Sequence, residues 1–469
     1  MAVARGRSLV ALLVLLAGLL GAAPAAVVAA PPPNIVVVLT DDQPVRTLQL
    51  MEHVQALRSR GVTFHQAVAS NALCCPSRAT ILTGLYSHST GVYTNGDGDE
   101  AIGGYRAFQQ NGNLDRTIAV SLDQAGYRTG LFGKFMNNYT RDDPVPPGWD
   151  QFHAIVGANG GYYDYDAVHA WAGGPVNHRS YGSDPADYST SVFGRRALRF
   201  LRAQDATTPF FMLFAPFAPH GPRKPAVRDA DVSAPGDHRS PAWNEADVSD
   251  KPPYIRALPT ISRDLADAWD SQYGSLESVD RWLGRFRTEL AERGLLARTV
   301  FVFLSDNGMT WGDHRFHYKR APYERSIGVP FVMSGPGIPH RGVGTVVANV
   351  DLAPTLLDLA GVPAGPFDGR SLVPLFEGGS LGRRSVLLEH ARDPVRGIPS
   401  YCGLRTPRWK YVAYAGGFEE VYDLRRDPNE LRNLARPGMW HIDELREETR
   451  RRCDPLPPGF PVGFWDELD

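Results

Sequence analysis

Short runs of apolar, β-branched residues set the strongest constraint on the fold of this chain. Residues 34–40 read Asn-Ile-Val-Val-Val-Leu-Thr, and comparable runs cover residues 210–214 and 299–304. Continuous apolar runs of this length are typical of strands that are buried on both faces of a parallel sheet. Helical patterns at residues 51–60 and 262–293 alternate with these runs. The alternation predicts an α/β fold with a mostly parallel central sheet.

Glycines and one aspartate mark the expected helix ends. Gly61, Gly126 and Gly294 follow helical patterns, where a left-handed residue commonly ends a helix. Asp115 stands at the start of a pattern that continues to Ala125, and an aspartate side chain accepts hydrogen bonds from the free N–H groups of a first helical turn. We therefore expect Asp115 to cap a helix there.

The pattern changes after about residue 380. Four short strand patterns and one helical pattern follow, at residues 385–389, 401–405, 410–414, 420–424 and 442–451. Short strands in succession favour an antiparallel sheet. We therefore expect a main domain at residues 31–379 and a small antiparallel α+β domain at residues 380–469.

Residues 1–30 have the pattern of a secretory signal peptide. Arg5 and Arg7 precede an apolar run at residues 9–20, and small residues lead to Ala30. A retained membrane anchor is the alternative, but the apolar run is short for a membrane span. We expect cleavage near Ala30 and export of the mature chain.

The charge balance and the cysteine count exclude several classes of protein. The 469 residues include 49 basic and 51 acidic residues, so the chain lacks the excess positive charge that nucleic-acid binding uses. Its four cysteines are too few for a disulfide scaffold of this size. Pairing of Cys402 with Cys453 in an oxidising compartment stays open. No segment after the leader is long and apolar enough to cross a bilayer, so we expect no membrane contact after cleavage.

Polar side chains stand at the ends of three predicted strands. Asp41 and Asp42 follow the first strand, His220 lies near the end of the second, and Asp306 with Asn307 follow the third. In open α/β sheets, ligands bind at the carboxyl ends of the strands. Buried carboxylates this close together repel one another, and a hard divalent cation such as Ca²⁺ or Mg²⁺ removes that conflict. Either pair alone is more typical of a solvated turn, but both pairs at strand ends favour a metal site.

Residues 72–84 hold a second set of chemical groups. They contain Cys74-Cys75-Pro76-Ser77-Arg78, with Pro76 suited to the first turn of a helix and Gly84 to its end. A cysteine at a helix N-terminus lies where free N–H groups attract anions and lower a thiol pKa. By helix position alone, Cys75 is the candidate for that place.

This segment resembles the C-x-P-S-R signature of the type I, formylglycine-dependent sulfatases. The signature has one residue between its cysteine and its proline, so the match assigns the special position to Cys74 and a structural role to Cys75. Further matches follow in family order over nearly the whole mature chain: residues 34–42, Gly133-Lys134, Pro219-His220, residues 305–308, Lys319 with Tyr323-Glu324, residues 422–424, Asp427-Pro428, Glu430 and Asn433-Leu434. The resemblance implies an alkaline-phosphatase-like α/β sandwich, in which residues 31–379 form the catalytic domain.

The resemblance also implies a reaction and its residues. In this family a separate maturation enzyme oxidises the signature cysteine to formylglycine, whose hydrate attacks the sulfur of a sulfate monoester. Carried over to this chain, the ligands of Ca²⁺, with Mg²⁺ as the alternative ion, are Asp41, Asp42, the group formed from Cys74, Asp306 and Asn307. The catalytic residues carried over are Cys74, Arg78, Lys134, His220 and Lys319. His220 and Lys319 are the candidates for the acid that protonates the leaving group.

One position departs from the family pattern. Many members have a histidine two residues after the first lysine, where this chain has Met136. This variant and the double cysteine resemble the branch of the N-acetylglucosamine-6-sulfatases and extracellular heparan sulfatases, which implies a sulfated amino sugar or a glycosaminoglycan end as substrate, with aryl sulfates as the simpler class. Asn137 or Asn138 is expected to replace the missing hydrogen bond. His314 is an equal candidate for a sugar contact or a plain surface residue.

Two other functions stay open at this point. A phosphonate or phosphodiester hydrolase of the same superfamily can share the cysteine signature and the metal pairs, although a phosphoryl centre generally needs more cationic groups or a second metal. The second is an inactive sugar-binding homologue, and the intact Cys74 and Arg78 argue against it. We expect a secreted enzyme, or one on the exterior of the cell envelope, whose partners are its sulfated substrate and the maturation enzyme.

Overall fold

Within the described residues, ten strands form one sheet. The computed structural model describes residues 31–468 except 97, 158–160, 364 and 436–439, so the expected signal peptide at residues 1–30 lies outside the described residues. The strands are β1 (Asn34–Thr40), β2 (Val62–Val68), β3 (Arg128–Lys134), β4 (Gln151–Val156), β5 (Tyr165–Trp171), β6 (Asn177–Tyr181), β7 (Phe210–Ala215), β8 (Thr299–Ser305), β9 (Phe331–Ser334) and β10 (Arg341–Ala348). Their order across the sheet is β10-β2-β9-β8-β1-β7-β3-β4-β5-β6.

The centre of this sheet is parallel. β1 pairs in parallel with β7 on one side and with β8 on the other, so Val36 lies beside Met212 and Phe301. β3 also pairs in parallel with β7 and β4. Antiparallel pairs occur where β9 joins β8 and β2, and at the edge formed by β4, β5 and β6. The mostly parallel sheet predicted from the sequence is confirmed, whereas β5 and β6 extend it with strands that the sequence pattern did not indicate.

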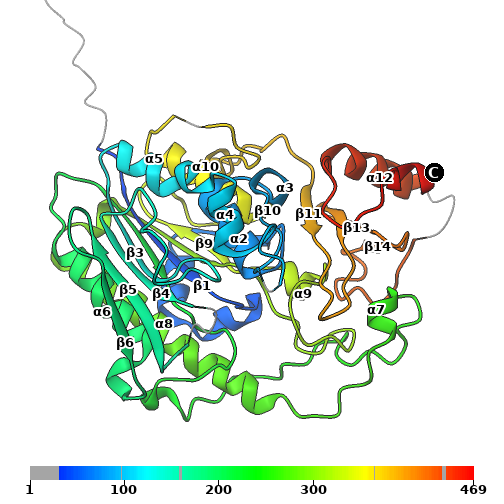
Figure 1. Cartoon of the computed structure of the whole chain (residues 1–469), viewed down its shortest axis with the longest axis horizontal. Helices are drawn as coiled ribbons and strands as arrows, with labels where there is room; N and C mark the ends of the chain where they lie inside the picture. Colours follow the sequence, from blue (N-terminus) through cyan, green and yellow to red (C-terminus); the bar gives the residue numbers. More distant parts are fainter. Residues whose placement is uncertain (1–30, 97, 158–160, 364, 436–439, 469) are drawn as a thin grey trace, which may run out of the picture. The chain divides into compact units, whose positions relative to one another are not determined.

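Two layers of helices cover the two faces of the sheet. The first layer contains α2 (Cys74–Thr83), α5 (Ile118–Gln124) and α10 (Leu352–Leu359), and the second contains α1 (Glu52–Arg58), α6 (Ser189–Arg202) and α8 (Ala266–Glu292). Ile35 and Val37 of β1 face the first core, and Val36 and Val38 face the second. Each of these fully buried aliphatic side chains contributes about 1.5–3 kcal/mol relative to an exposed position. β1 is therefore held between the layers, as Figure 1 shows for α2, α5 and α10 on one face and α6 and α8 on the other.

The helix expected after Asp115 has a different cap. Asp115 lies in a 3-10 turn, Asn113–Arg116, and α5 begins at Ile118. The extended backbone of Thr117 (φ −81°, ψ 154°) and its side chain, which accepts a hydrogen bond from the Val120 N–H, make Thr117 the cap. The prediction for Asp115 is wrong, because the separate turn removes this side chain from the first N–H groups of α5. α1 and α8 confirm the helices predicted at residues 51–60 and 262–293. Among the described helices, none has the length and apolar character that a bilayer span needs.

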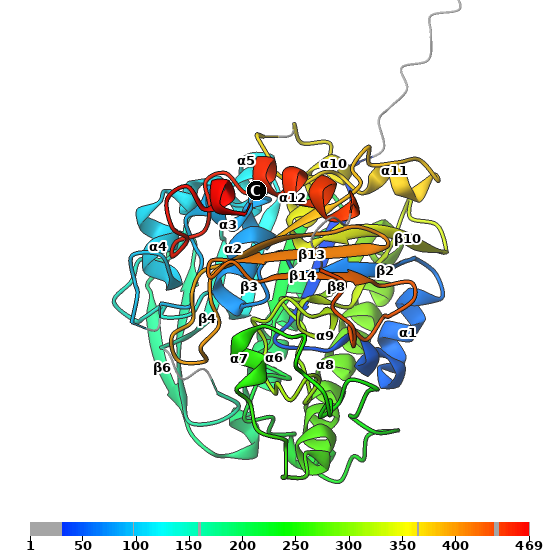
Figure 2. The same cartoon turned by 90° about the vertical axis from the view of Figure 1, so that its right-hand side faces the viewer.

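A second, smaller sheet lies in the C-terminal part of the chain. β11 (Val386–His390), β12 (Tyr401–Arg405), β13 (Trp409–Tyr414) and β14 (Glu419–Asp423) pair in that order, all antiparallel. The terminal helix α12 (Trp440–Arg452) packs on β12 and β13, as seen in Figure 2. The predicted antiparallel sheet and terminal helix are confirmed, and the domain boundary between residues 379 and 380 stays a prediction.

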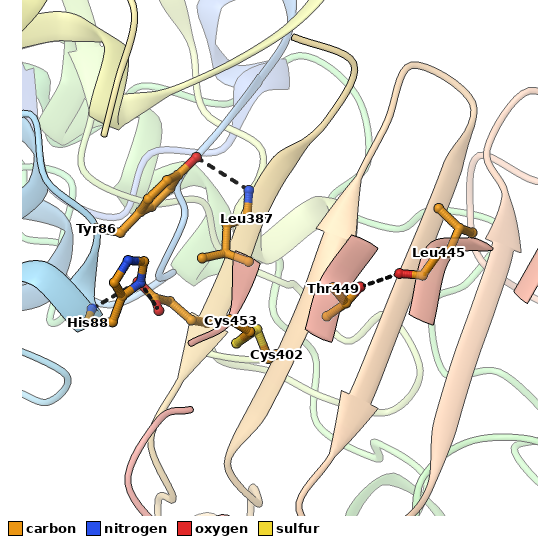
Figure 3. Close-up of a disulfide and its surroundings, with 8 residues drawn as sticks. Tyr86, His88, Leu387, Cys402, Leu445, Thr449 and Cys453 are labelled. Atoms are coloured by element: carbon orange, nitrogen blue, oxygen red, sulfur yellow. Dashed lines mark hydrogen bonds and ion pairs between the residues drawn. A yellow bond between two sulfur atoms is a disulfide. The ribbon is translucent and has the colours of Figure 1, made fainter. Parts of the chain in front are cut away.

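A disulfide bond joins this sheet to the end of α12. Cys402 of β12 is bonded to Cys453, and both residues are buried (Figure 3). The two cysteines are 51 residues apart in sequence, so the bond links two separate segments of the C-terminal part of the chain. The pairing that the sequence left open is therefore present.

Removing the disulfide is expected to destabilise the protein. A disulfide restricts the unfolded chain, and one that closes a loop of this length typically contributes about 2–4 kcal/mol. We expect the Cys402→Ala/Cys453→Ala variant to melt several degrees below the wild type in circular dichroism, and dithiothreitol to lower the melting temperature of the wild type only. Identical melting of both proteins, with and without the reductant, would contradict this.

Candidate active site

Several elements end at one edge of the large sheet and bring charged side chains together. The groups are Asp41 and Asp42 after β1, Lys134 at the end of β3, His220 after β7, Asp306 and Asn307 after β8, and Cys74 and Arg78 in α2. β1, β3, β7 and β8 are parallel neighbours, so their carboxyl ends meet at this edge. The structure brings together the strand-end residues that the sequence singled out, and their individual roles stay predictions.

Two backbone positions show how closely the strand ends are fixed. Gly133 precedes Lys134 with φ +126°, and a Cβ atom there would lie 2.0 Å from the Ala215 carbonyl oxygen. Only glycine therefore allows β3 this approach to the end of β7. Asp42 has a left-handed φ of 65°, a costly conformation for a non-glycine residue that persists where its surroundings fix it. The Asp42 N–H supplies such a restraint by donating to Asp306 Oδ1 at 3.1 Å.

α2 delivers two of the candidate groups from its first turns. The helix begins at Cys74, and the Cys75 N–H donates to Asn95 Oδ1 at 3.0 Å. Gly84 ends the helix with a left-handed φ of 69°, as predicted from the sequence. Arg78 follows Cys74 by one helical turn, so both side chains lie on the same face, and both are buried.

Arg78 connects three parts of the cluster. Its Nε donates to Asp306 Oδ2 at 2.9 Å, and its Nη1 donates to the Lys134 carbonyl oxygen at 2.8 Å. Its Nη2 lies 3.7 Å from Asp41 Oδ2 and has no hydrogen-bond acceptor among the described residues. Since the guanidinium is buried, this N–H is available to an anionic oxygen inside the cluster.

Two lysines contact the carboxylates of the same cluster. Lys134 Nζ donates to Asp41 Oδ2 at 2.5 Å. Lys319 Nζ donates to Asp42 Oδ1 and to Cys74 Sγ, which lies 2.6 Å away. On its other side, the Cys74 thiol donates to Asp41 Oδ1 at 3.2 Å. Cys74 therefore lies between a carboxylate and an ammonium group.

Burial and neighbouring charges set the protonation of these groups. Burial opposes ionisation of Asp41, but Lys134 and His220 outweigh it and hold the pKa of Asp41 well below its usual value. Burial, followed by the charge of Asp41, raises the pKa of the Cys74 thiol far above its usual value. The same two causes raise the pKa of Asp306 to about 6. An unmodified Cys74 is therefore protonated, and a protonated thiol is a weak nucleophile.

His220 borders a cavity of about 380 Å³. Its Nδ1 lies 2.7 Å from the Gly221 carbonyl oxygen and so carries a hydrogen, and its Nε2 lies 3.6 Å from Asp42 Oδ2. Burial lowers the pKa of His220 against the opposing pull of Asp42. The imidazole, 31% exposed, links the buried cluster to the cavity. Other residues that line this cavity are Lys134, Asn137, Tyr162, Tyr163, Phe217 and Lys224.

The oxygen-rich part of the cluster fits a hard divalent cation. Candidate ligand atoms of Asp41, Asp42, Cys74 and His220 all lie within 4.8 Å of one another. Asn307 donates its amide N–H to Asp42 Oδ1 at 2.7 Å, while its buried Oδ1 has no hydrogen-bond partner among the described residues. Adjacent carboxylates and an unpartnered amide oxygen are donors of the kind that Ca²⁺ and Mg²⁺ prefer.

Asp306 has a different environment from the other predicted metal ligands. Its Oδ1 accepts hydrogen bonds from the N–H groups of Asp42 and Asn307, at 3.1 and 2.8 Å. Its Oδ2 accepts from Arg78. Both oxygens are thus already hydrogen-bonded, and His220 takes the fourth place in the geometric cluster. The role of Asp306 as a metal ligand stays a prediction.

The two predicted substrate contacts differ in their surroundings. Asn137 lines the cavity beside the buried Met136, and its buried Oδ1 has no partner among the described residues. His314 is 1% exposed, its Nδ1 lies 2.6 Å from Glu245 Oε2, and its ring centroid lies 4.2 Å from that of Tyr323. His314 therefore fits neither a plain surface residue nor an accessible sugar contact, because its ring is packed and paired inside the protein.

Sequence patterns did not predict several polar residues that hold the cluster. Asn349 Nδ2 donates to Ser77 Oγ at 2.8 Å, and Ser77 donates in turn to the Asp306 carbonyl oxygen. Asn95 accepts from the Cys75 N–H. Asn349 directly follows β10, so the same strand-end signal would have found it if that strand had been predicted. Asn95 lies in an irregular loop and has no such signal.

The C-terminal sheet holds the segment that follows Lys319. From β12, Tyr401 donates to the Arg320 carbonyl oxygen at 2.7 Å, and Arg405 pairs with Glu324 at 2.9 Å. From β13, Lys410 donates to the Pro322 carbonyl oxygen. From β14, Glu420 accepts a hydrogen bond from the Tyr323 hydroxyl at 2.9 Å. Four of the five residues at 320–324 are thus fixed by the second sheet. The place of Lys319 in the cluster depends on both sheets.

Comparison with known proteins identifies relatives over most of the chain. The model of the Sulfatase family matches residues 33–362, and that of the N-sulphoglucosamine sulphohydrolase C-terminal region matches residues 312–452. Human (Homo sapiens) N-acetylglucosamine-6-sulfatase is 32% identical over 457 residues, which cover 85% of this chain and 80% of the relative. A putative extracellular sulfatase Sulf-1 homolog of Caenorhabditis elegans is 34% identical over 352 residues, which cover 72% of this chain and 48% of the relative. This chain therefore spans about half the length of the C. elegans protein.

A solved structure shares the fold. The phosphonate monoester hydrolase of Agrobacterium radiobacter matches with a TM-score of 0.69 and 25% identity, covering 90% of this chain and 96% of that protein. The expected alkaline-phosphatase-like sandwich, with its second antiparallel sheet, is confirmed. The family match, which extends over more than half of the residues, agrees with the identity to the human relative. The chain belongs to the sulfatase family.

Proposed function

We propose that this protein hydrolyses sulfate monoesters, with sulfated sugars as its substrates and aryl sulfates as smaller substitutes. The observation that carries the proposal is the position of Cys74 at the start of α2. Its Sγ lies 3.2 Å from Asp41 Oδ1 and 2.6 Å from Lys319 Nζ, inside a buried cluster of charges. This is the position that the C-x-P-S-R signature assigns to the attacking group.

We propose that a maturation enzyme converts Cys74 to formylglycine. The hydrated aldehyde supplies a hydroxyl nucleophile at a position where burial and the charge of Asp41 keep a thiol protonated. Asp41 Oδ1 is placed to accept a proton from the atom bound to Cβ of residue 74, and Lys319 Nζ is placed to donate one to it. The two groups lie on either side of that atom.

Arg78, Lys134 and His220 have separate tasks in the proposed reaction. The unpartnered Nη2 of Arg78 and the ammonium of Lys134, which lines the cavity, bind the sulfate oxygens and stabilise the charge that develops there. His220 borders the same cavity, so it or Lys319 protonates the leaving alcohol. Asn137, with its unpartnered Oδ1, is proposed to contact the substrate in place of the missing family histidine.

A divalent cation is proposed at the strand ends, with Ca²⁺ ahead of Mg²⁺. Asp41, Asp42, the group formed from residue 74, and Asn307 through its free Oδ1 would hold it, and Asp306 is the remaining predicted ligand. The cation would lower the pKa of a bound hydroxyl and withdraw charge from the sulfate oxygens. The side chains around it keep the tasks described above.

The proposed substrate class and location follow from the relatives and the leader. The human relative is named for N-acetylglucosamine 6-sulfate, and the C. elegans relative is named as extracellular. A cavity of about 380 Å³ beside His220 has room for a sugar ring. With the signal-peptide pattern at residues 1–30, these features support a secreted or envelope-exterior enzyme that binds neither nucleic acid nor, after cleavage, a membrane.

A phosphonate monoester hydrolase is the alternative that a specific observation favours, because such an enzyme shares the fold at 25% identity. A direct comparison of substrates separates the two. We expect protein made together with the maturation enzyme to hydrolyse 4-nitrophenyl sulfate with a kcat/KM at least about 100-fold above that for a 4-nitrophenyl phosphonate monoester, a difference of roughly 2.7 kcal/mol in transition-state stabilisation.

The cysteine variants provide the control for that comparison. Cys74→Ala should abolish turnover, whereas Cys75→Ala, one residue further along the same buried turn, should retain it. Preference for the phosphonate would assign the protein to the alternative reaction. Turnover by the Cys74→Ala variant would show that residue 74 is not the attacking group, and binding of sulfated sugars without any turnover of the matured wild type would support a sugar-binding protein.

Lys319 is expected to act on the chemical step. Lys319→Met removes the ammonium that contacts Cys74, and we expect kcat for 4-nitrophenyl sulfate to fall by about 10²–10⁴-fold, the usual effect of losing an acid or base. Arg426→Met removes an exposed cation that is far from the cluster in sequence and should leave kcat unchanged. A Lys319→Met variant that keeps the wild-type kcat and melting temperature would exclude the proposed role.

Asn307 is expected to contribute to cation affinity. Asn307→Ala removes the unpartnered Oδ1, so we expect Ca²⁺ to bind about 10–100-fold more weakly in isothermal titration calorimetry of protein stripped with EDTA. Asn177→Ala, a substitution of an exposed asparagine in β6, is the matched control. Equal Ca²⁺ affinity of the wild type and Asn307→Ala would remove Asn307 from the ligand set.

A further inference from the structure

A group of N–H donors without acceptors lies next to the proposed active site. The Arg223 guanidinium carbon lies 4.6 Å from the centroid of the Trp311 ring, and the ring centroids of His317 and Trp311 are 5.3 Å apart. Arg223 Nε, Trp311 Nε1 and His317 Nε2 are buried, and none has a hydrogen-bond partner among the described residues. Trp311 is 2% exposed, so its N–H is a fully desolvated donor.

All three of these nitrogen atoms are hydrogen-bond donors. His317 Nδ1 accepts a hydrogen bond from Arg263 Nη2 at 2.8 Å, so the hydrogen of a neutral His317 is on Nε2. Burial, together with the charges of Arg223 and Arg263, lowers the pKa of His317 to about 4, which keeps the ring neutral near pH 7. Buried donors are costly without acceptors, so a set that contains donors alone calls for a group that contains acceptors alone. A sulfate or a carboxylate is such a group.

The positive charges of Arg223 and Arg263 are a further feature of this group. Among the described residues, no carboxylate forms an ion pair with Arg223 or Arg263; Arg263 instead donates to His317, and Arg223 stacks on Trp311. Burial lowers the pKa of Arg223, and the charge of Asp42 partly opposes this effect. Arg223 therefore lies close enough to Asp42 for the two charges to interact, although they form no ion pair.

Residues next to Arg223 in sequence line one cavity, and Arg263 and His317 line a second. Gly221, Pro222 and Lys224 line the cavity of about 380 Å³ that contains His220. Arg263, His317 and Tyr318 line a second cavity of about 540 Å³. Arg223 follows Pro222, has a left-handed φ of 59°, and its N–H donates to the His220 carbonyl oxygen at 3.0 Å. A strained non-glycine residue in this position is a feature often found at binding sites.

We propose that Arg223 and His317, packed on Trp311, form together with Arg263 a second anion subsite beside the sulfate-ester site. It takes a further sulfate or carboxylate group on the same saccharide whose sulfate ester enters the first cavity. This inference rests on the proposed function and narrows its substrate class to sugars with at least two anionic groups. The planar guanidinium groups offer paired donors to the oxygens of the second anion, and Tyr318, 45% exposed, offers an aromatic face to a sugar ring.

The subsite is tested by binding, in protein that cannot turn over its ligand. In the Cys74→Ala background, saturated with Ca²⁺, calorimetry compares D-glucosamine 6-O-sulfate with D-glucosamine 2-N,6-O-disulfate. We expect the disulfate to bind at least about 10-fold more tightly, and Arg223→Ala to reduce that ratio to below about 3-fold. Arg263→Ala should reduce it in the same direction, and Arg223→Lys should restore only part of it, because lysine lacks the planar group that stacks on Trp311.

The control removes the same charge from the same loop. Arg228 is exposed in the turn Val227–Asp229, and Arg228→Ala should leave the ratio unchanged. Equal affinity for the two sugars, or a loss that Arg223→Ala imposes equally on both, would overturn the subsite. The proposed reaction is scored separately by turnover of 4-nitrophenyl sulfate in the matured wild type. If that turnover is absent but the affinity ratio of the two sugars still depends on Arg223, the proposed reaction is wrong and the subsite is retained.

Discussion

Three buried carboxylates and three buried cations form the interaction on which the rest of the structure depends. Asp41, Asp42 and Asp306 are matched by Arg78, Lys134 and Lys319, with contacts between strands and helices that are distant in sequence. Leaving one such charge unpaired in the interior typically costs about 3–5 kcal/mol. The ends of β1, β3 and β8 and the start of α2 are therefore fixed relative to one another by charge as well as by packing.

The C-terminal sheet is part of this arrangement. Lys319 reaches Cys74 and Asp42, but the segment that follows it is held by side chains of β12, β13 and β14. Glu420, for example, accepts hydrogen bonds from the hydroxyl groups of Tyr323 and two tyrosines of its own sheet. The smaller sheet therefore positions one cation of the cluster, which gives a physical reason for a second sheet in a chain whose first sheet already supplies most of the site.

The parts of the fold that the sequence could predict are those with local signals. Continuous apolar runs marked β1, β7 and β8, and the polar residues directly after them led to the cluster. Asp115 failed as a cap because an additional turn precedes α5, a feature that no local preference encodes. His314 was expected to be accessible but is buried, because it pairs with Glu245, which lies in a loop 69 residues away in sequence. The contact of Arg223 with Trp311 likewise depends on tertiary structure alone.

The charge balance of the cluster explains why substrate selectivity would be decided outside it. The three carboxylates and three cations sum to zero, so a bound divalent cation would leave an excess of two positive charges for the sulfate ester and the negative charge that develops during its cleavage. Any further anion on the substrate finds no unpaired cation within the cluster. Arg223, which stacks on Trp311, and Arg263, which donates to His317, lack carboxylate partners among the described residues. An inner site that is neutral by itself and an outer site that keeps its positive charge together favour a substrate with one anion to cleave and another to hold.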